Sequence, residues 1–153
     1  MDPILDVRNL QTHFFTKAGV LKAVDGVSFQ IGAGEIVGLV GESGSGKSIT
    51  GFSILGLVDA PGRIVGGEIL FSGRDLTKLP PAEIQKMRGS RIAMIFQDPM
   101  MTLNPVLRIE TQMTEAIQTH DSSVSKDEAR QRSRDALGMV GISSPGERMR
   151  AYP

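Results

Sequence analysis

The N-terminal part of the chain alternates apolar and polar residues in the manner of β-strands. Two such stretches, residues 4–15 and 21–31, flank a polar segment with a glycine at residues 16–19, so we expect an antiparallel pair of strands. A continuous apolar run at residues 35–40 follows the glycine-rich turn at residues 32–34. Its length and its flanks predict a buried strand.

The middle of the chain predicts shorter elements. Residues 61–67 are expected to be a break between elements, because proline and glycine lie at both of its ends. Residues 68–71 form a short strand pattern, and the proline pair at residues 80–81 can begin a short helix. Residues 91–96 are apolar again and predict a core strand beside residues 35–40.

The C-terminal third of the chain has helical periodicity. Ile109, Met113, Ala116 and Ile117 share one face of a predicted helix. Residues 125–128 form a Ser-Lys-Asp-Glu capping box, which marks the start of a second helix.

These patterns divide the chain into three regions. We place an antiparallel β subdomain at residues 1–34, an α/β core at residues 35–98 and the start of a helical subdomain at residues 99–153. A chain of 153 residues has the length of one average domain.

Composition narrows the functional classes without identifying one. The 17 basic and 17 acidic residues cancel, so no overall field favours nucleic acid or an anionic membrane. The absence of cysteine excludes disulfides and thiolate metal sites and is typical of a reducing cytoplasm. No segment approaches the roughly 18 apolar residues of a membrane span. Any membrane role would therefore act through another protein.

A phosphate-binding loop is the strongest chemical signal in the sequence. Residues 41–48 fit the pattern G-x-x-x-x-G-K-[ST] in full, between the apolar run at 35–40 and a helix-compatible stretch at 49–55. The alternative, a Gly/Ser-rich turn, requires neither Lys47 nor Ser48. The candidate nucleotide-binding residues of this loop are Gly41, Glu42, Ser43, Gly44, Ser45, Gly46, Lys47, Ser48 and Ile49.

Each part of the loop matches the chemistry of a nucleotide polyphosphate. The glycines allow the backbone to approach the phosphates, and the following helix N-terminus directs unpaired N–H groups at them. Lys47 would reach the β- and γ-phosphates, and the Ser48 hydroxyl would bind Mg²⁺. The sequence therefore predicts a chain that binds a nucleoside triphosphate with Mg²⁺.

Three segments together resemble the ATP-binding subunit of an ABC transporter. They are Gly34-Glu35, the phosphate loop, and residues 95–99, which read Ile-Phe-Gln-Asp-Pro. Within that family, residues 96–105 and 21–29 resemble the dipeptide, oligopeptide and nickel importer branch. The resemblance covers essentially the whole chain.

The resemblance implies a P-loop NTPase of the ABC type, with an α/β core, an antiparallel β subdomain and a helical subdomain. It implies ATP and Mg²⁺ as cofactors, and ATP hydrolysis that drives import of peptides or nickel. The implied partners are transmembrane permease subunits and a second ATP-binding subunit, identical or different, with no nucleic acid. The implied location is the cytoplasmic face of the cell membrane.

The resemblance also assigns roles to single residues outside the phosphate loop. Gln97 matches the family's Q-loop glutamine, which binds Mg²⁺ and orders the attacking water, so Gln97 and Lys47 are the candidate catalytic residues. Phe14 lies where the family has an aromatic residue that stacks on adenine. Phe15 is the alternative, since adjacent strand residues point to opposite faces and only one of them can stack.

A partner surface is expected after Gln97. The resembled importers dock a helix of the membrane subunit there, and residues 98–106 carry the apolar Met100, Met101 and Leu103. The alternative is that these side chains fold into the domain's own core. His13 and His120 lack neighbouring ligands of a metal site in the sequence.

The resemblance implies further motifs that the sequence lacks. They are a Leu-Ser-Gly-Gly signature, a strand that ends in Asp-Glu and a later His, so the chain is expected to be incomplete and to lack hydrolysis by itself. The alternatives are a nucleotide-binding fragment without activity, a non-transport ABC ATPase, a GTPase and a small-molecule kinase. The Asn-Lys-x-Asp string of a GTPase is absent from the sequence.

Overall fold

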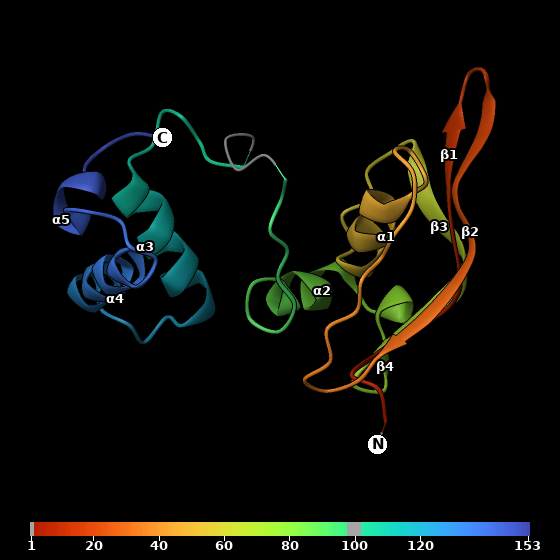
Figure 1. The fold of residues 1–153 in the computed structure, drawn as a ribbon, viewed down its shortest axis with the longest axis horizontal. Coiled ribbons are helices and arrows are strands. Elements are labelled where there is room, and N and C mark those ends of the chain that lie inside the picture. The colour runs from red at the N-terminus through yellow and green to blue at the C-terminus, as the bar shows by residue number, and fades with distance from the viewer. Residues whose placement is uncertain (1, 98–101) are drawn as a thin grey trace. The chain divides into compact units, whose positions relative to one another are not determined.

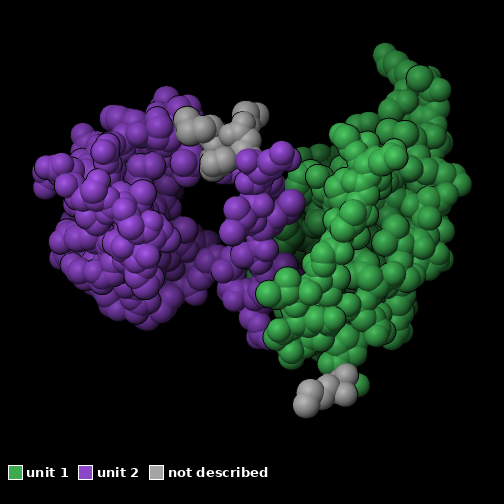
Figure 2. All heavy atoms as spheres, in the orientation of Figure 1, with its two compact units in different colours: residues 1–88 green, residues 89–153 purple. Residues whose placement is uncertain are grey.

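The computed structural model describes residues 2–97 and 102–153. It divides the chain into two compact units, Met1–Arg88 and Gly89–Pro153 (Figure 2). Each unit has its own secondary structure, labelled in Figure 1.

The first unit is built on an antiparallel sheet with the strand order β2-β1-β3-β4. Its strands are β1 (Leu5–Thr16), β2 (Gly19–Ile31), β3 (Gly62–Phe71) and β4 (Arg74–Asp75). The predicted antiparallel pairing of the first two strands is confirmed.

The predicted break at residues 61–67 is wrong, because β3 begins at Gly62 and continues through it. The strand does so by a change of register between β1 and β3 after Arg8. Gly67 has a φ of +88°, and a Cβ there would collide with the carbonyl oxygens of Arg8 and Asn9. The glycine that looked like a breaker is therefore the residue that fits an irregular strand pairing.

The core of the first unit follows from alternation along the strands. The buried apolar side chains come mainly from one face of the sheet and from the elements that pack on it: Leu5, Val7, Leu10, Val24, Leu55, Ile69, Phe71 and Leu76. Helix α1 (Lys47–Ile54) packs against β1 and β2. The predicted helix after the phosphate loop is confirmed.

A short 3₁₀ helix, η1 (Leu76–Lys78), and helix α2 (Pro81–Met87) complete the first unit. Pro81 occupies the first turn of α2, as predicted. Arg88 follows α2 and donates to the carbonyl oxygens of Leu55 and Gly56 at 2.7 and 2.6 Å. It thereby satisfies carbonyl groups at the C-terminal end of α1.

The two predicted core strands at residues 35–40 and 91–96 are wrong as strands. Neither segment joins the sheet, and Ile36, Val40 and Ile95 are 98%, 93% and 97% exposed. An apolar run becomes a strand only when neighbouring strands accept its backbone hydrogen bonds. Within the described ranges 2–97 and 102–153, no ladder forms beside either segment, apart from a single bridge that includes Ile92.

The second unit is helical. It contains α3 (Ile109–His120), α4 (Lys126–Met139) and the short α5 (Pro145–Arg148). The predicted capping box is confirmed, because the Ser125 hydroxyl accepts a hydrogen bond from the Glu128 N–H.

The helices of the second unit pack around a small core that includes Val124, Ala129 and Met149. The N–H groups of Ile109 and Glu110 donate to the carbonyl oxygens of Ala151 and Met149, at 3.0 and 2.8 Å. The segment after α4 thus caps the free N-terminal end of α3. No helix in the described part of the chain has both the length and the apolar content needed to cross a membrane.

Candidate nucleotide-binding site

The phosphate loop lies directly before α1, in the first unit. Gly46, the N-cap of α1, has a φ of +89°. A Cβ at this position would collide with the carbonyl oxygen of Ala23 in β2. Both the backbone conformation and the contact therefore require glycine, and the loop rests directly on the backbone of β2.

The ammonium group of Lys47 folds back over the loop. Its Nζ donates to the carbonyl oxygens of Gly41 and Glu42, at 2.7 Å each, and lies 3.4 Å from Ser45 Oγ. These bonds are exposed. Because phosphate oxygens are charged acceptors, they bind an ammonium group more strongly than neutral carbonyls do. The Lys47 ammonium group can therefore release the two loop carbonyls and bind a phosphate oxygen in their place.

The N-terminus of α1 is open to an anion. Gly46 supplies no side-chain cap, and the first turn holds no acidic residue. The N–H groups of the first turn, including those of Ser48 and Ile49, keep the partial positive charge of a helix N-terminus. Together with Lys47, this arrangement is suited to a phosphate group.

The donor set around the loop fits Mg²⁺ that accompanies phosphate. The Ser48 residue is exposed at the start of α1. In residues 2–97 and 102–153, no three His, Asp or Glu side chains gather as a metal site. Mg²⁺ in nucleotide sites is held by few protein oxygens, by water and by the phosphates themselves. One hydroxyl beside a phosphate cradle agrees with that pattern.

Gln97, the other predicted Mg²⁺ ligand, belongs to the second unit and is exposed. Its role beside the phosphate loop stays a prediction. Met100 and Met101 of the predicted docking surface lie outside the described residues. Leu103, from the same surface, is half-buried, as is Met113 on the helix that follows.

Phe14 and Phe15 have different surroundings. A Cβ built on Gly62 would lie 2.6 Å from Cε1 of Phe14, so the Phe14 ring packs directly on the β3 backbone. Phe15 is 39% exposed, and the Arg63 guanidinium lies 4.1 Å from its ring centroid. The choice of Phe14 as the adenine-stacking residue stays a prediction.

A buried hydrogen bond joins the strand of Phe14 to the helix of the phosphate loop. Thr12 Oγ1 lies 2.8 Å from Ser53 Oγ, and both residues are almost completely buried. Ser53 also donates to the Ile49 carbonyl at 2.7 Å. The pair fixes β1 against α1 two residues before Phe14. Sequence reasoning missed it, because the two hydroxyls are 41 residues apart and only the fold brings them together.

The structure describes one acidic neighbour of His13. Its Nε2 is buried without a hydrogen-bond partner among the described residues, and it lies 3.7 Å from Asp25 Oδ1. One carboxylate at that distance does not form a metal site.

Known proteins resemble this chain in sequence and in structure. The family model described as "ABC transporter" matches residues 24–152. The oligopeptide transport ATP-binding protein AppD of Bacillus subtilis (strain 168) is 49% identical over 154 residues, which cover 100% of this chain and 47% of that protein. The probable peptide ABC transporter ATP-binding protein y4tR of Sinorhizobium fredii (strain NBRC 101917 / NGR234) is 46% identical over 153 residues, 99% of this chain and 45% of that protein.

The chain therefore spans about half the length of the curated relatives it matches. Among solved structures, it is similar to the ATP-binding cassette MJ0796, in a dimeric post-hydrolysis state bound to ADP and Pi. The TM-score is 0.83 at 23% identity, over 97% of this chain and 61% of that chain. This likeness confirms the predicted fold class, the N-terminal part of a P-loop ATPase cassette.

Proposed function

Because the chain belongs to the ABC transporter family, we propose that it is the nucleotide-binding half of a subunit that uses ATP to power peptide import. The observation that carries this proposal is the Lys47 ammonium group, held by loop carbonyls in front of an uncapped helix N-terminus. That arrangement suits a polyphosphate. The peptide substrate is inferred from the names of the relatives, which are peptide transport proteins.

In this proposal each candidate residue has a distinct task. The loop N–H groups and Lys47 hold the phosphates, and Phe14 stacks on adenine. Ser48 and Gln97 hold Mg²⁺, whose charge would offset that of the phosphates. The burial of the Thr12–Ser53 pair supports a fixed spacing between the base-stacking strand and the phosphate helix.

The partners and the location follow from the same proposal. The chain would work beside a second ATP-binding subunit and beneath transmembrane permease subunits, on the cytoplasmic face of the membrane. Hydrolysis is proposed for the whole protein, because the chain spans about half the length of its curated relatives. Peptides are preferred over nickel as the cargo, because both relatives described above are named for peptides.

Calorimetry on the Lys47→Ala variant tests nucleotide binding. Losing one charged hydrogen-bond donor should cost about 2 kcal/mol of ATP binding, which is roughly a 30-fold rise in Kd. Binding of adenosine should stay unchanged, because adenosine carries no phosphate. Lys22→Ala is the matched control, since Lys22 pairs with Asp25 on the strand β2. An equal loss for ATP and adenosine would contradict the assignment.

A further inference from the structure

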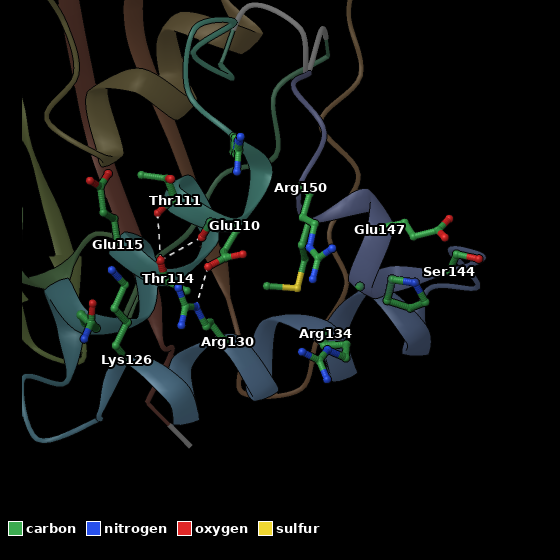
Figure 3. A pocket seen from close by; sticks show the side chains of 15 residues that line it. Glu110, Thr111, Thr114, Glu115, Lys126, Arg130, Arg134, Ser144, Glu147 and Arg150 are labelled. Carbon is green, nitrogen blue, oxygen red and sulfur yellow. Dashed lines mark hydrogen bonds and ion pairs between the residues drawn. The ribbon is translucent and has the colours of Figure 1, made fainter.

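The second unit contains a hollow that the nucleotide site does not use. It has a volume of about 1050 Å³ and opens between α3, α4 and α5 (Figure 3). We call it the arginine-lined hollow, because five basic side chains line it: Arg108, Lys126, Arg130, Arg134 and Arg150. Ile109 and Met113, from the predicted docking surface, are not part of its lining.

The basic side chains of the hollow differ in their partners. Arg130 is neutralised by Glu110, and it also lies 3.3 Å from Asp127. Arg134, Arg150 and Lys126, in contrast, form no salt bridge with any residue that the structure describes. These three cations line a common hollow in which basic side chains outnumber acidic ones, so the hollow can accept negative charge from outside the chain.

The acidic residues of the lining offset only part of the positive charge, since Glu115 and Glu147 also line the hollow and form no salt bridge within the described residues. The lining contains three glutamates, of which Glu110 is already paired with Arg130. The side chain of Glu147 points away from Arg134 and Arg150 in Figure 3. Five basic side chains therefore face three acidic ones in the lining, which leaves a net positive charge.

The spacing of the cations indicates the kind of anion. Lys126, Arg130 and Arg134 follow one another at intervals of four residues on α4, so they form a stripe about 12 Å long. A single phosphate group cannot reach all of them. Carboxylates that repeat along a polypeptide have a similar spacing, and arginine binds carboxylates through two parallel hydrogen bonds.

The size of the hollow agrees with this interpretation. Small-molecule pockets are typically about 300–1,000 Å³ and enclose most of their ligand. At about 1050 Å³, this hollow is slightly larger than that range. We propose that it binds an acidic segment of a partner polypeptide, whose carboxylates engage Arg134, Arg150 and Lys126. This surface belongs to the second unit, whereas the phosphate loop belongs to the first.

A fluorescence anisotropy titration tests the proposal on the chain as it stands. The probe is a short fluorescein-labelled peptide rich in Glu, and the matched peptide carries Gln at the same positions. Only the Glu peptide should bind, and added salt should weaken it. The double variant Arg134→Ala/Arg150→Ala should raise its Kd about tenfold, because two charge-assisted contacts are lost.

Control variants make the outcome specific. Arg132→Ala should change the Kd of the peptide less than about twofold, since Arg132 pairs with Glu128 and does not line the hollow. Arg134→Lys should weaken binding less than Arg134→Ala does, because it keeps the charge but loses the two parallel hydrogen bonds. Lys47→Ala should bind the peptide normally, so failure of the nucleotide proposal is distinguishable from failure of this one.

Several results would overturn the proposal. Equal binding of the Gln peptide would show that carboxylates are not recognised, and an equal loss in Arg132→Ala would show non-specific attraction to α4. Displacement of the peptide by inorganic phosphate at the same ionic strength would instead indicate a small-anion site. No binding of the Glu peptide by a folded chain, as judged by circular dichroism, would also overturn it.

Discussion

The phosphate loop and the arginine-lined hollow both offer positive charge, but they are built in opposite ways. The loop uses backbone N–H groups, a helix N-terminus and one lysine, and its shape depends on a glycine pressed against β2. The hollow uses long side chains, three from α4 and one each from the residues that flank α3 and α5. A backbone site has a fixed geometry and suits one compact anion, whereas a stripe of side chains tolerates many arrangements of carboxylates.

This comparison predicts where each region is vulnerable. A single methyl group should destroy the loop, while the hollow should lose binding gradually as charges are removed.

The largest effect is expected for Gly46→Ala. The new Cβ would collide with the Ala23 carbonyl, and the positive φ of this position is unfavourable for alanine. We expect a loss of more than about 3 kcal/mol in the free energy of unfolding of the first unit, together with loss of ATP binding. Denaturant titration and calorimetry measure the two effects.

Gly138→Ala is the matched control for that change. Gly138 lies in α4, and a Cβ there has open space around it. Alanine should stabilise the helix by up to about 1 kcal/mol. A Gly46→Ala protein that binds ATP as tightly as the unchanged chain would show that the loop does not depend on its backbone geometry.

The second effect is a dependence of the stability of the first unit on pH, through the Asp75 carboxylate. Burial raises the pKa of Asp75, but hydrogen bonds from Lys78, Thr77 and Ile69 outweigh it and hold the pKa at about 2, against an ordinary value of 3.8. Because the folded pKa is the lower one, the ionised carboxylate stabilises the first unit above pH 3.8. That stabilisation is lost as the pH falls toward 2.

Asp75→Asn should therefore cost about 2 kcal/mol at pH 7 and almost nothing near pH 2. Denaturant titrations at the two pH values measure the difference. Asp127→Asn is the control in the second unit, where Asp127 is highly exposed and pairs with Arg130. An unchanged pH dependence in Asp75→Asn would show that another group controls acid stability.

The sequence predicts the locally encoded parts of these two regions. The phosphate loop, the helix after it and the Ser125 cap depend on neighbours within a few residues, and all three are found in the structure. The strands expected at residues 35–40 and 91–96 are absent, since a strand needs partners that periodicity alone does not supply.

Contacts between residues far apart in the chain could not be predicted from the sequence either. The collision that makes Gly46 obligatory involves Ala23 on another element, and the Thr12–Ser53 pair joins a strand to a helix. The arginine-lined hollow likewise needs three helices to come together. Such pairings depend on tertiary packing, which propensity and motif spacing do not encode.

The third effect concerns the buried hydrogen bond that joins β1, which carries the proposed base-stacking residue, to α1, which follows the phosphate loop. Thr12→Val keeps the shape of the side chain but removes its hydrogen bond to Ser53, which should cost about 1 kcal/mol of stability. If the pair sets the spacing of β1 and α1, ATP should bind about threefold to fivefold more weakly. Inorganic tripolyphosphate, which has no base, should bind as before.

Thr12→Ser should restore the affinity for ATP, because it restores the hydroxyl. Competition with a fluorescent nucleotide measures both ligands. Equal weakening of ATP and tripolyphosphate would mean that the pair supports the phosphate loop itself and does not set the position of the base.

The smallest effect is expected when the second unit alone is destabilised. Ser125 caps α4 by accepting a hydrogen bond from the Glu128 N–H, and α4 carries the stripe of cations in the arginine-lined hollow. Ser125→Ala should destabilise α4 by about 1 kcal/mol. The acidic peptide should then bind up to about fivefold more weakly if the fraying reaches Lys126 and Arg130. ATP binding should not change in this variant, because the phosphate loop belongs to the first unit. Ser122→Ala, in the turn before the cap, is the control. A parallel loss of ATP affinity in Ser125→Ala would show that the two regions do not act separately.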